Sequence, residues 1–393
     1  MKMKKGIKAI IAIVLIIAVI GGWVSTFRTD TVYGQALPKL ADYNGGSLTQ
    51  NEVTVPTPLL NSDGVLVSPG YCVHNQYQYD RSAVTAGSLR IKEWDFYQLT
   101  DGRYMIQIIA SDIGLGGGYF FTFVDLETGD KYEAMSMSLF TMGKLNLETN
   151  AEKDHTISVD KKNFKLTMDI KNGKRHFTFE GEGSGKRLTC DLTASQFTDH
   201  ESLTMAVPFE WSNYFYLDQK INCMSVSGNV TVDGEKIEFD PAKTFMLLDW
   251  GRGVWPYRSG WYWGNGSTVL EDGRTFGFEI GFGFGDMTKF TENTLFISEG
   301  ENLVAHKLEH VFLEKAEGDD GWMKEWKFTS NDGRFEMTMT PYYDNYTTTR
   351  VVVAGNWCHQ VFGKWNGYVV LDDGTKVEIK DMIAFCEYSD NRW

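Results

Sequence analysis

The sequence predicts an all-β protein made of two duplicated antiparallel barrels after an N-terminal transmembrane helix. Three observations lead to this prediction: Asp-Gly and Asn-Gly dipeptides between short apolar runs, an internal repeat, and a lysine-flanked apolar segment near the N-terminus. Such dipeptides between strand-like runs are typical of β-hairpins, and many hairpins at regular spacing indicate a sandwich or a barrel.

The N-terminal segment 9–27 has 19 uncharged, mainly aliphatic positions and follows four lysines. A helix of this length is about 28 Å long, which is enough to cross the apolar core of a bilayer. Because lysines favour the cytoplasmic side, we expect a cytoplasmic stub and single-pass anchor in residues 1–29, with the body on the other side of the cell membrane. A cleaved signal peptide is the alternative, although residues 21–25 make a poor cleavage site.

The charge of the body excludes some partners. Residues 1–29 hold five of the 38 basic residues and no acid, so the remaining chain has 33 basic and 52 acidic residues, a net charge of −19. Such a surface repels phosphates, which argues against nucleic-acid binding. The chain has 40 glycines, eight prolines and 14% aromatic residues, a composition that suits strands, tight turns and large buried cores.

The cysteines give no sign of a metal or redox site. The chain contains five: Cys72, Cys190, Cys223, Cys358 and Cys386. None is in C-x-x-C spacing, so we expect no structural zinc, no redox centre and no cofactor. Because the number is odd, at least one thiol has no partner for an intramolecular disulfide.

An internal repeat indicates a duplication. Asp101-Gly-Arg recurs at residue 272, and the Phe-x-x-Thr-Met motif at residue 164 recurs at 335, both at an offset of 171. Two later matches, 223–228 with 358–363 and 233–238 with 373–378, have offsets of 135 and 140. The order is kept while the spacing changes, as expected when loops differ in length between two copies.

The repeat defines the domain boundaries that we expect. A polar connector occupies residues 30–70, the first barrel residues 71–255 and the second barrel residues 256–393. Each copy is long enough for an antiparallel barrel of roughly eight to ten strands. The pairing of Cys223 with Cys358 as equivalent positions makes them packing residues rather than partners in one disulfide.

Several short motifs carry a family resemblance. They are Leu248–Tyr257, Trp261–Trp263, Phe282–Asp286, Thr291–Asn293, Gln360–Gly363 and Asn391–Trp393. Together they resemble the bacterial domain-of-unknown-function family 2804 and, more distantly, the double lipocalin-like barrels of carotenoid 1,2-hydratase relatives, which handle isoprenoid or other apolar molecules. The resemblance implies two calycin-like barrels with an apolar cavity, and it supplies no reaction. The anchor is a departure from a family of mainly soluble chains.

The same resemblance implies a way of closing each barrel. Lipocalin-like barrels place an early-strand tryptophan beneath a late-strand arginine, and a cation over an indole is favourable by about 1 kcal/mol. Here the pairs would be Trp94 with Arg252, and Trp261 or Trp263 with Arg392. The alternative is that these residues belong to a ligand site.

The strand predicted at residues 276–284 alternates aromatic residues with small ones and carries one acid, Glu279. If its glycine face points inward, it leaves room for a ligand beside that carboxyl group. If the aromatic residues fill the core instead, the glycines permit coiling and Glu279 meets solvent. The offsets pair Glu279 with Ile108 and His359 with Met224, so the second copy gained the polar groups.

Three residues are candidate general acids or bases: Glu279, His359 and Asp249. A carboxyl and an imidazole in one apolar barrel suit proton transfer, because burial raises the pKa of the acid. Asp249 stands near Arg252, and such a pair is more often structural. The expected walls of the ligand site are Trp261, Trp263, Phe282 and Tyr257.

Two other motifs have simpler explanations. Residues 306–310 match H-x-x-E-H, which binds zinc when it lies on a helix, but they follow the strand-like run 294–297. Residues 114–118 are glycine-rich like a phosphate loop, yet a strand-like run follows where a helix is required. We therefore expect strands and a turn at these places and no metal ligands.

The sequence leaves three functions open. The first is a membrane-anchored, extracytoplasmic protein that binds an apolar, lipid- or isoprenoid-like molecule. The second is a hydratase, isomerase or cyclase that acts on such a molecule by general acid chemistry. The third is a cell-surface glycan binder that uses exposed tryptophans.

Overall fold

The computed structural model describes residues 48–351 and 354–393, which form an all-β molecule with two large antiparallel sheets and two short 3-10 helices, η2 (Arg81–Ala83) and η3 (Asp319–Gly321). The predicted anchor at 9–27 lies outside these residues. Within the described part of the chain, no helix combines the length and apolarity needed to cross a membrane.

The first sheet contains thirteen strands of the N-terminal part. They are β2 (Gly70–Cys72), β4 (Lys92–Thr100), β5 (Tyr104–Asp112), β6 (Gly116–Asp125), β7 (Lys131–Leu139), β8 (His155–Lys161), β9 (Phe164–Lys171), β10 (Lys174–Gly183), β11 (Lys186–Ser195), β13 (Leu203–Pro208), β14 (Phe215–Val232), β15 (Glu235–Phe239) and β16 (Phe245–Val254). The strands β1 (Thr57–Pro58) and β3 (Tyr77–Gln78) form a separate small sheet.

The second sheet contains ten strands, nine of them from the C-terminal part. They are β12 (Asp199–His200), β17 (Arg258–Val269), β18 (Thr275–Phe282), β19 (Thr294–Glu299), β20 (Asn302–Lys307), β21 (Val311–Glu314), β22 (Trp326–Ser330), β23 (Phe335–Val351), β24 (Ala354–Val370) and β25 (Lys376–Arg392). The H-x-x-E-H run thus begins on β20 and ends in the short loop between β20 and β21, so it is not on a helix.

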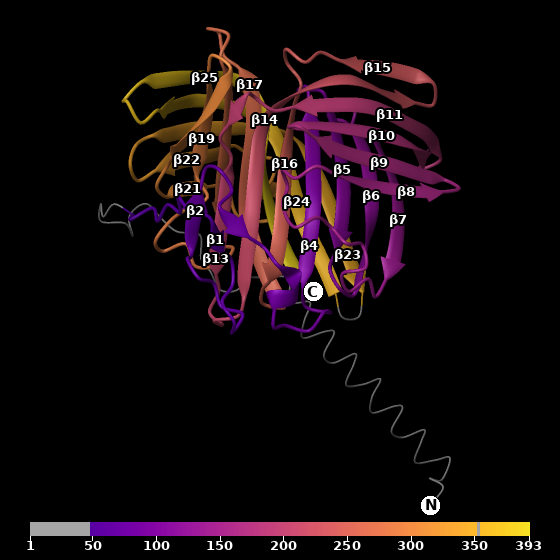
Figure 1. The fold of residues 1–393 in the computed structure, drawn as a ribbon. Coiled ribbons are helices and arrows are strands. Elements are labelled where there is room, and N and C mark those ends of the chain that lie inside the picture. Colours follow the sequence, from indigo (N-terminus) through magenta and orange to yellow (C-terminus); the bar gives the residue numbers. More distant parts are fainter. Residues whose placement is uncertain (1–47, 352–353) are drawn as a thin grey trace, which may run out of the picture.

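Both sheets wind in the same order. In the first, β7-β6-β5-β4 continues through β16 and β14 to β8; in the second, β20-β19-β18-β17 continues through β25 and β24 to β21. Each path has two ends, so each sheet is a curled half-barrel rather than the closed barrel expected. Figure 1 shows the two sheets packed against each other, with the long strands β23 and β24 behind β4 and β16.

Each half-barrel encloses its own apolar core. Tyr97, Ile108 and Phe177 belong to the first core, and Phe278, Trp326 and Trp365 belong to the second. The opposite faces of the central strands meet in a third layer between the sheets, where aromatic side chains mix with charged and amide groups. Burying charged groups costs free energy unless they are paired, so this layer is the place to look for a site.

The strand β18 shows how the two faces divide. Phe276, Phe278 and Ile280 fill the second core, while Glu279 is directed at the layer between the sheets and is fully buried. The expectation that its counterpart is Ile108 is wrong, because Ile108 lies in the first core. An offset of one residue changes the face of a strand, and the repeat alone does not detect this difference.

Candidate functional site

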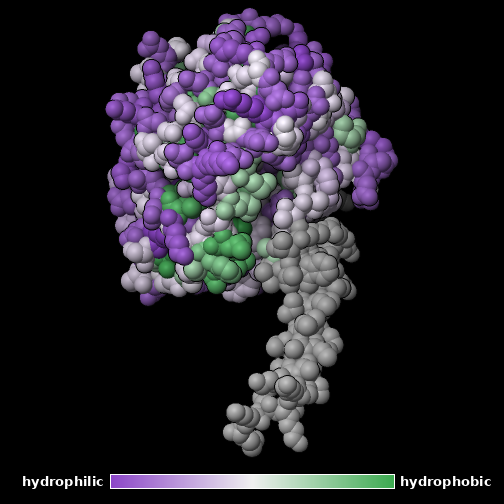
Figure 2. Space-filling model, turned by 90° about the vertical axis from the view of Figure 1, so that its right-hand side faces the viewer, coloured by the Kyte–Doolittle hydropathy of each residue, from purple (hydrophilic) through white to green (hydrophobic). Residues whose placement is uncertain are grey.

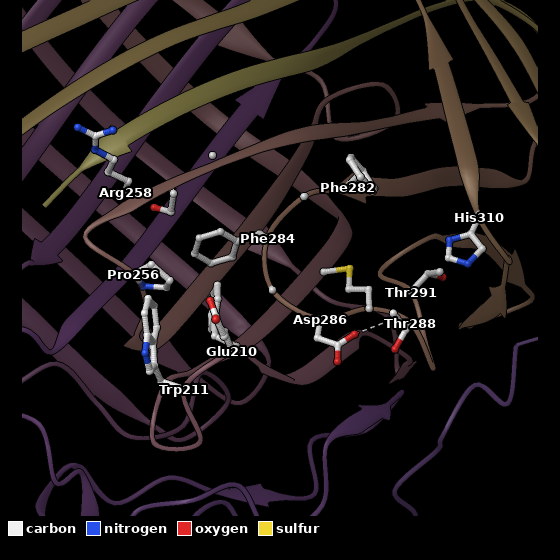
Figure 3. Close-up of a pocket in the computed structure, with 17 residues that line it drawn as sticks. Glu210, Trp211, Pro256, Arg258, Phe282, Phe284, Asp286, Thr288, Thr291 and His310 are labelled. Atoms are coloured by element: carbon white, nitrogen blue, oxygen red, sulfur yellow. Dashed lines mark hydrogen bonds between the residues drawn. The ribbon is translucent and has the colours of Figure 1, made fainter. Parts of the chain in front are cut away.

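A pocket of about 630 Å³ opens where the two sheets meet. Its walls come from the β13–β14 turn, the β16–β17 connection, and the end of β18 with the loop that follows. They comprise Phe209, Glu210, Trp211, Pro256, Arg258, Ser259, Gly260, Gly281, Phe282, Gly283, Phe284, Gly285, Asp286, Met287, Thr288, Thr291 and His310. Figure 3 shows the Phe284 ring between the Trp211–Pro256 side and the Phe282–His310 side. The pocket has the size and aromatic character of a small-molecule site.

Glycines allow the loop after β18 to form this wall. Gly283 and Gly285 have φ angles of 100° and 91°, which residues with a side chain rarely adopt. A Cβ atom at Gly285 would lie 2.4 Å from the Val207 side chain. The backbone amide of Asp286 donates a hydrogen bond to the Pro208 carbonyl at 2.8 Å and holds the loop in place. The buried ring of Phe284 is thereby held at the base of the pocket.

A second, smaller cavity lies behind Phe284 and Met287, which line both spaces. Its volume is about 30 Å³, enough to hold about one or two water molecules. Aromatic rings and three ionisable side chains form its walls: Trp94, Tyr216, Lys220, Asp249, Trp261, Trp263, Phe284, Met287 and Glu292. We call this space the inner chamber.

Lys220 on β14 is the cation of the inner chamber. Its ammonium lies 3.2 Å from Asp218 and 3.1 Å from Asp249, and 4.1 Å from the centre of the Trp263 ring. Burial lowers the pKa of Lys220, but the carboxylates of Asp218 and Asp249 outweigh it, and the pKa lies well above its usual value. Lys220 is therefore charged at neutral pH.

Asp249 is held by three donors. Trp94 donates its indole N–H to Asp249 Oδ1 at 3.0 Å, and the Tyr216 hydroxyl donates to the same oxygen at 3.3 Å. Lys220 neutralises the other oxygen. With these three contacts, Asp249 orients Lys220 and the two rings.

Glu279 lies deeper than the inner chamber. It accepts hydrogen bonds from the Trp263 indole and from Asn265 Nδ2, the latter at 2.8 Å. Burial raises its pKa well above the usual value, and the charge of Lys220 opposes that effect. Of the two alternatives for Glu279, exposure to solvent is wrong because the side chain is fully buried, but it lines neither the pocket nor the inner chamber. Its position fits a residue that holds Trp263 in place.

Glu292, which follows β18 and its loop, lines the inner chamber and was missed by the sequence reasoning. It packs over Gly281 so closely that a Cβ atom there would lie 1.8 Å from Glu292 Oε1. Gly281 itself lines the pocket, so the carboxyl stands at the boundary of the two spaces. Burial raises the pKa of Glu292 to about 7, with Lys220 acting in the opposite direction. A substantial fraction is therefore protonated at neutral pH.

Trp261 is held by a second buried acid, Glu387 on β25. The indole donates to Glu387 Oε1 at 2.8 Å, and Gln360 donates to the other oxygen at 3.2 Å. The side-chain amide of Gln107 in the first sheet donates a hydrogen bond to Gln360 Oε1 at 3.0 Å and so connects the two sheets. Burial raises the pKa of Glu387 to about 7.

The structure separates His359 from the other two candidate catalytic residues. Its ring stacks on Trp322 at 4.0 Å, and Nδ1 lies 2.6 Å from Asp344. Its strand neighbour Val361 belongs to the core of the second half-barrel, whereas Gln360 faces the layer between the sheets. The expectation that His359 meets Glu279 in one barrel is therefore wrong, because alternate residues of β24 face opposite ways.

The expected closure pairs are also rearranged. Arg252 lies 4.1 Å over Trp250 rather than over Trp94, and it pairs with Asp95 at 2.8 Å. It also donates to the Trp94 carbonyl, while the Trp94 indole faces the inner chamber. Arg392 is buried and lies 3.4 Å from Asp390.

The expected walls of the ligand site divide between the two spaces. Phe282 lines the pocket, and Trp261 and Trp263 line the inner chamber. Tyr257 does not line the pocket, although its neighbours Pro256 and Arg258 do.

Comparison with known proteins gives a family and a set of distant structures. The model of the domain of unknown function DUF2804 matches residues 50–393. The chain belongs to this family. The resemblance in its sequence motifs is thereby confirmed, while no curated protein matches this DUF2804 member.

Solved structures with detectable similarity include an AttH-type protein of Nitrosomonas europaea, with 13% identity, a TM-score of 0.45 and coverage of 76% of this chain and 92% of that one. Kievitone hydratase from Nectria haematococca has 13% identity, a TM-score of 0.41 and coverage of 77% and 88%. CghA in complex with Sch210972 has 11% identity, a TM-score of 0.44 and coverage of 88% and 96%. Similarity at this level gives no information about the reaction of this DUF2804 member.

Proposed function

We propose that this protein binds an apolar small molecule in the pocket and acts on it by proton transfer from Glu292. The observation that carries the proposal is the position of this carboxyl group, which has a pKa near 7 at the boundary between an aromatic pocket and a water-sized chamber. General acids work best when their pKa lies near the working pH. Perturbed acids beside a cavity are a common feature of active sites.

The chemistry follows from the groups in place. Protonated Glu292 gives its proton to a carbon of a C=C bond, which leaves a carbocation on the substrate and a carboxylate on the protein. The carboxylate then takes a proton from the neighbouring carbon, which completes an isomerisation, or from a water molecule that adds to the cation, which completes a hydration. The aromatic rings of Trp261, Trp263 and Phe284 favour such a cation. Lys220 remains protonated and compensates the carboxylate.

The other functions receive less support. A glycan platform needs exposed tryptophans, and among the described tryptophans Trp211 is the most exposed, at 50%. A carrier without chemistry needs the pocket but gives no reason for the buried acids around the inner chamber.

We keep the membrane anchor at residues 9–27, and the extracytoplasmic position of the body, as part of the proposal. The common winding order of the two sheets supports a duplication as their origin.

The binding part is tested with full-length protein purified from its own host and examined by native mass spectrometry. Thr288→Trp fills the mouth of the pocket, and Thr375→Trp places the same side chain on an exposed turn as the control. We expect a bound apolar molecule in the wild type and the control, and at least tenfold less in Thr288→Trp. N-phenyl-1-naphthylamine, a neutral apolar dye, provides a second measurement. Equal occupancy or dye binding in all three proteins contradicts the proposal.

The chemical part is tested by incubating the captured molecule with enzyme in D2O. Proton transfer to carbon introduces deuterium, which raises the mass of the molecule. We expect uptake with the wild type and with Glu299→Gln, an exposed control, and none with Glu292→Gln. Binding without deuterium uptake by the wild type identifies a carrier. Uptake that persists in Glu292→Gln assigns the acid to another residue.

A further inference from the structure

Exposed apolar side chains form a band that leads to the mouth of the pocket. Strand β7 is an edge strand, and one of its faces presents Met135, Met137 and Leu139, followed by Phe140, to solvent. Leu139 is 77% exposed, and the other three are each more than half exposed. Figure 2 looks onto the side of the molecule where β7 lies and shows apolar surface gathered on its lower part. Contiguous apolar surface of this kind marks an interaction site.

A series of contacts between loops connects the end of β7 to the pocket. The Met142 amide donates to the Gly114 carbonyl, and Gly114 lies against the backbone of Leu89, which is itself 43% exposed. The next residue, Arg90, lies over the Tyr214 ring at 5.9 Å. Tyr214 closes the turn that carries Trp211, the exposed tryptophan on the pocket wall. These contacts connect the end of β7 to the turn at the entrance of the site, and Leu89 and Trp211 are the exposed apolar residues along this path.

The backbone holds the band in an outward position. Phe140 and Met142 have φ angles of 52° and 49°, a conformation that is uncommon for residues other than glycine and costs about 1 kcal/mol or more. Exposing Phe140 in this way gains nothing for the folded core. Such strain at an exposed aromatic residue indicates a role in contact with a partner.

We propose that this band, residues 135–142 with Leu89 and Trp211, rests on a lipid bilayer and turns the pocket mouth toward it. The proposal adds a surface to the proposed function and rests on the pocket, not on the reaction. Trp and Phe with flanking cations are the residues that enter the membrane interface, and Arg90 and Lys144 flank this band. Glu210 next to Trp211 limits how deep that end can go.

The place where the described chain begins also supports a bilayer at this surface. Leu48 donates to Glu309, and Gln50 bonds to Leu308 and Thr291, so the chain enters the body beside the wall formed by Thr291 and His310. The 20 residues 28–47 separate the uncharged segment 9–27 from Leu48. A chain of 20 residues spans at most roughly 70 Å. A bilayer that holds this segment is therefore within reach of the pocket. A second protein strand added to β7 would cover the strand edge but not Leu89 or Trp211.

The test uses full-length protein in vesicles of phosphatidylcholine and phosphatidylglycerol. Leu139→Cys carries a nitrobenzoxadiazole label, and Val269→Cys, at the far end of β17 from the pocket, carries the same label as the control. Burial raises the pKa of all five native thiols, so they react slowly with the reagent. With doxyl-labelled phosphatidylcholine we expect quenching at position 139 that is several-fold stronger than at 269.

Equal quenching at the two positions, or none at either, overturns the proposal. Shielding of the label at 139 without quenching by lipid, together with cross-linking between protein copies, identifies a protein interface and also overturns it. Leu139→Asp should lower the quenching of a label at position 137 several-fold. The same variant should bind N-phenyl-1-naphthylamine normally in detergent, which separates failure of this surface from failure of the pocket.

Discussion

The pKa of Glu292 makes a prediction about folding stability that needs no ligand. Its carboxyl group has a pKa of about 7 in the folded protein, mainly because it is buried, against 4.5 when exposed. The folded state therefore binds more protons than the unfolded chain between pH 4.5 and 7. Because of this difference, the free energy of unfolding falls as the pH rises through that window. A change in pKa of this size corresponds to about 3 kcal/mol.

Glu292→Gln keeps the shape of the neutral acid and removes its ionisation. We expect the variant and the wild type to have similar stability at pH 4.5 to 5. At pH 8 the variant should be more stable by about 2 to 3 kcal/mol, because it no longer pays for a buried charge. Urea unfolding followed by tryptophan fluorescence measures both curves across this range. Glu387 also has a raised pKa near 7, so the wild-type curve falls further than Glu292 alone requires.

The comparison between the two curves isolates the single residue. Glu299→Gln, at the exposed end of β19, is the control and should follow the wild type at every pH. If the wild type and Glu292→Gln fall in parallel between pH 5 and 8, Glu292 does not hold its proton in the folded state. The assignment of Glu292 as the acid would then be wrong as well.

Three further variants test the packing of the site. Gly281→Ala pushes the Glu292 carboxyl away and should lower stability by about 1 to 3 kcal/mol in urea unfolding, whereas Gly87→Ala, which meets open space, should change it little. Trp263→Phe removes the indole that donates to Glu279 and should lower the free energy of unfolding by about 1 to 3 kcal/mol. An unchanged melting temperature would contradict this prediction. Arg252→Met leaves the buried Asp95 without its cation and should cost about 3 to 5 kcal/mol; a loss below 1 kcal/mol would show that this pair is dispensable.

The sequence by itself determined that the chain is an all-β protein with antiparallel strands. Alternating apolar runs and Asp-Gly turns specify strands because side chains alternate faces with a period of two. The same reasoning identified the glycine-rich strand around Glu279, and the motif that contains Glu292 was part of the family resemblance. Whether Glu279 faces a ligand space or solvent stayed open, because the period of the strand does not reveal that a second sheet covers its outer face.

Only the tertiary structure decided which residues share a space. The core that a strand residue faces depends on how the sheets pack: Glu279 faces the layer between the sheets while Ile108 faces the first core, and the adjacent residues His359 and Gln360 of β24 point to opposite sides. Lys220, Asp249 and Glu292 lie far apart in the chain and meet because two curled sheets pack face to face. The pKa values of Lys220 and Glu292 depend on the burial that this packing creates, and no local pattern in the sequence records that burial.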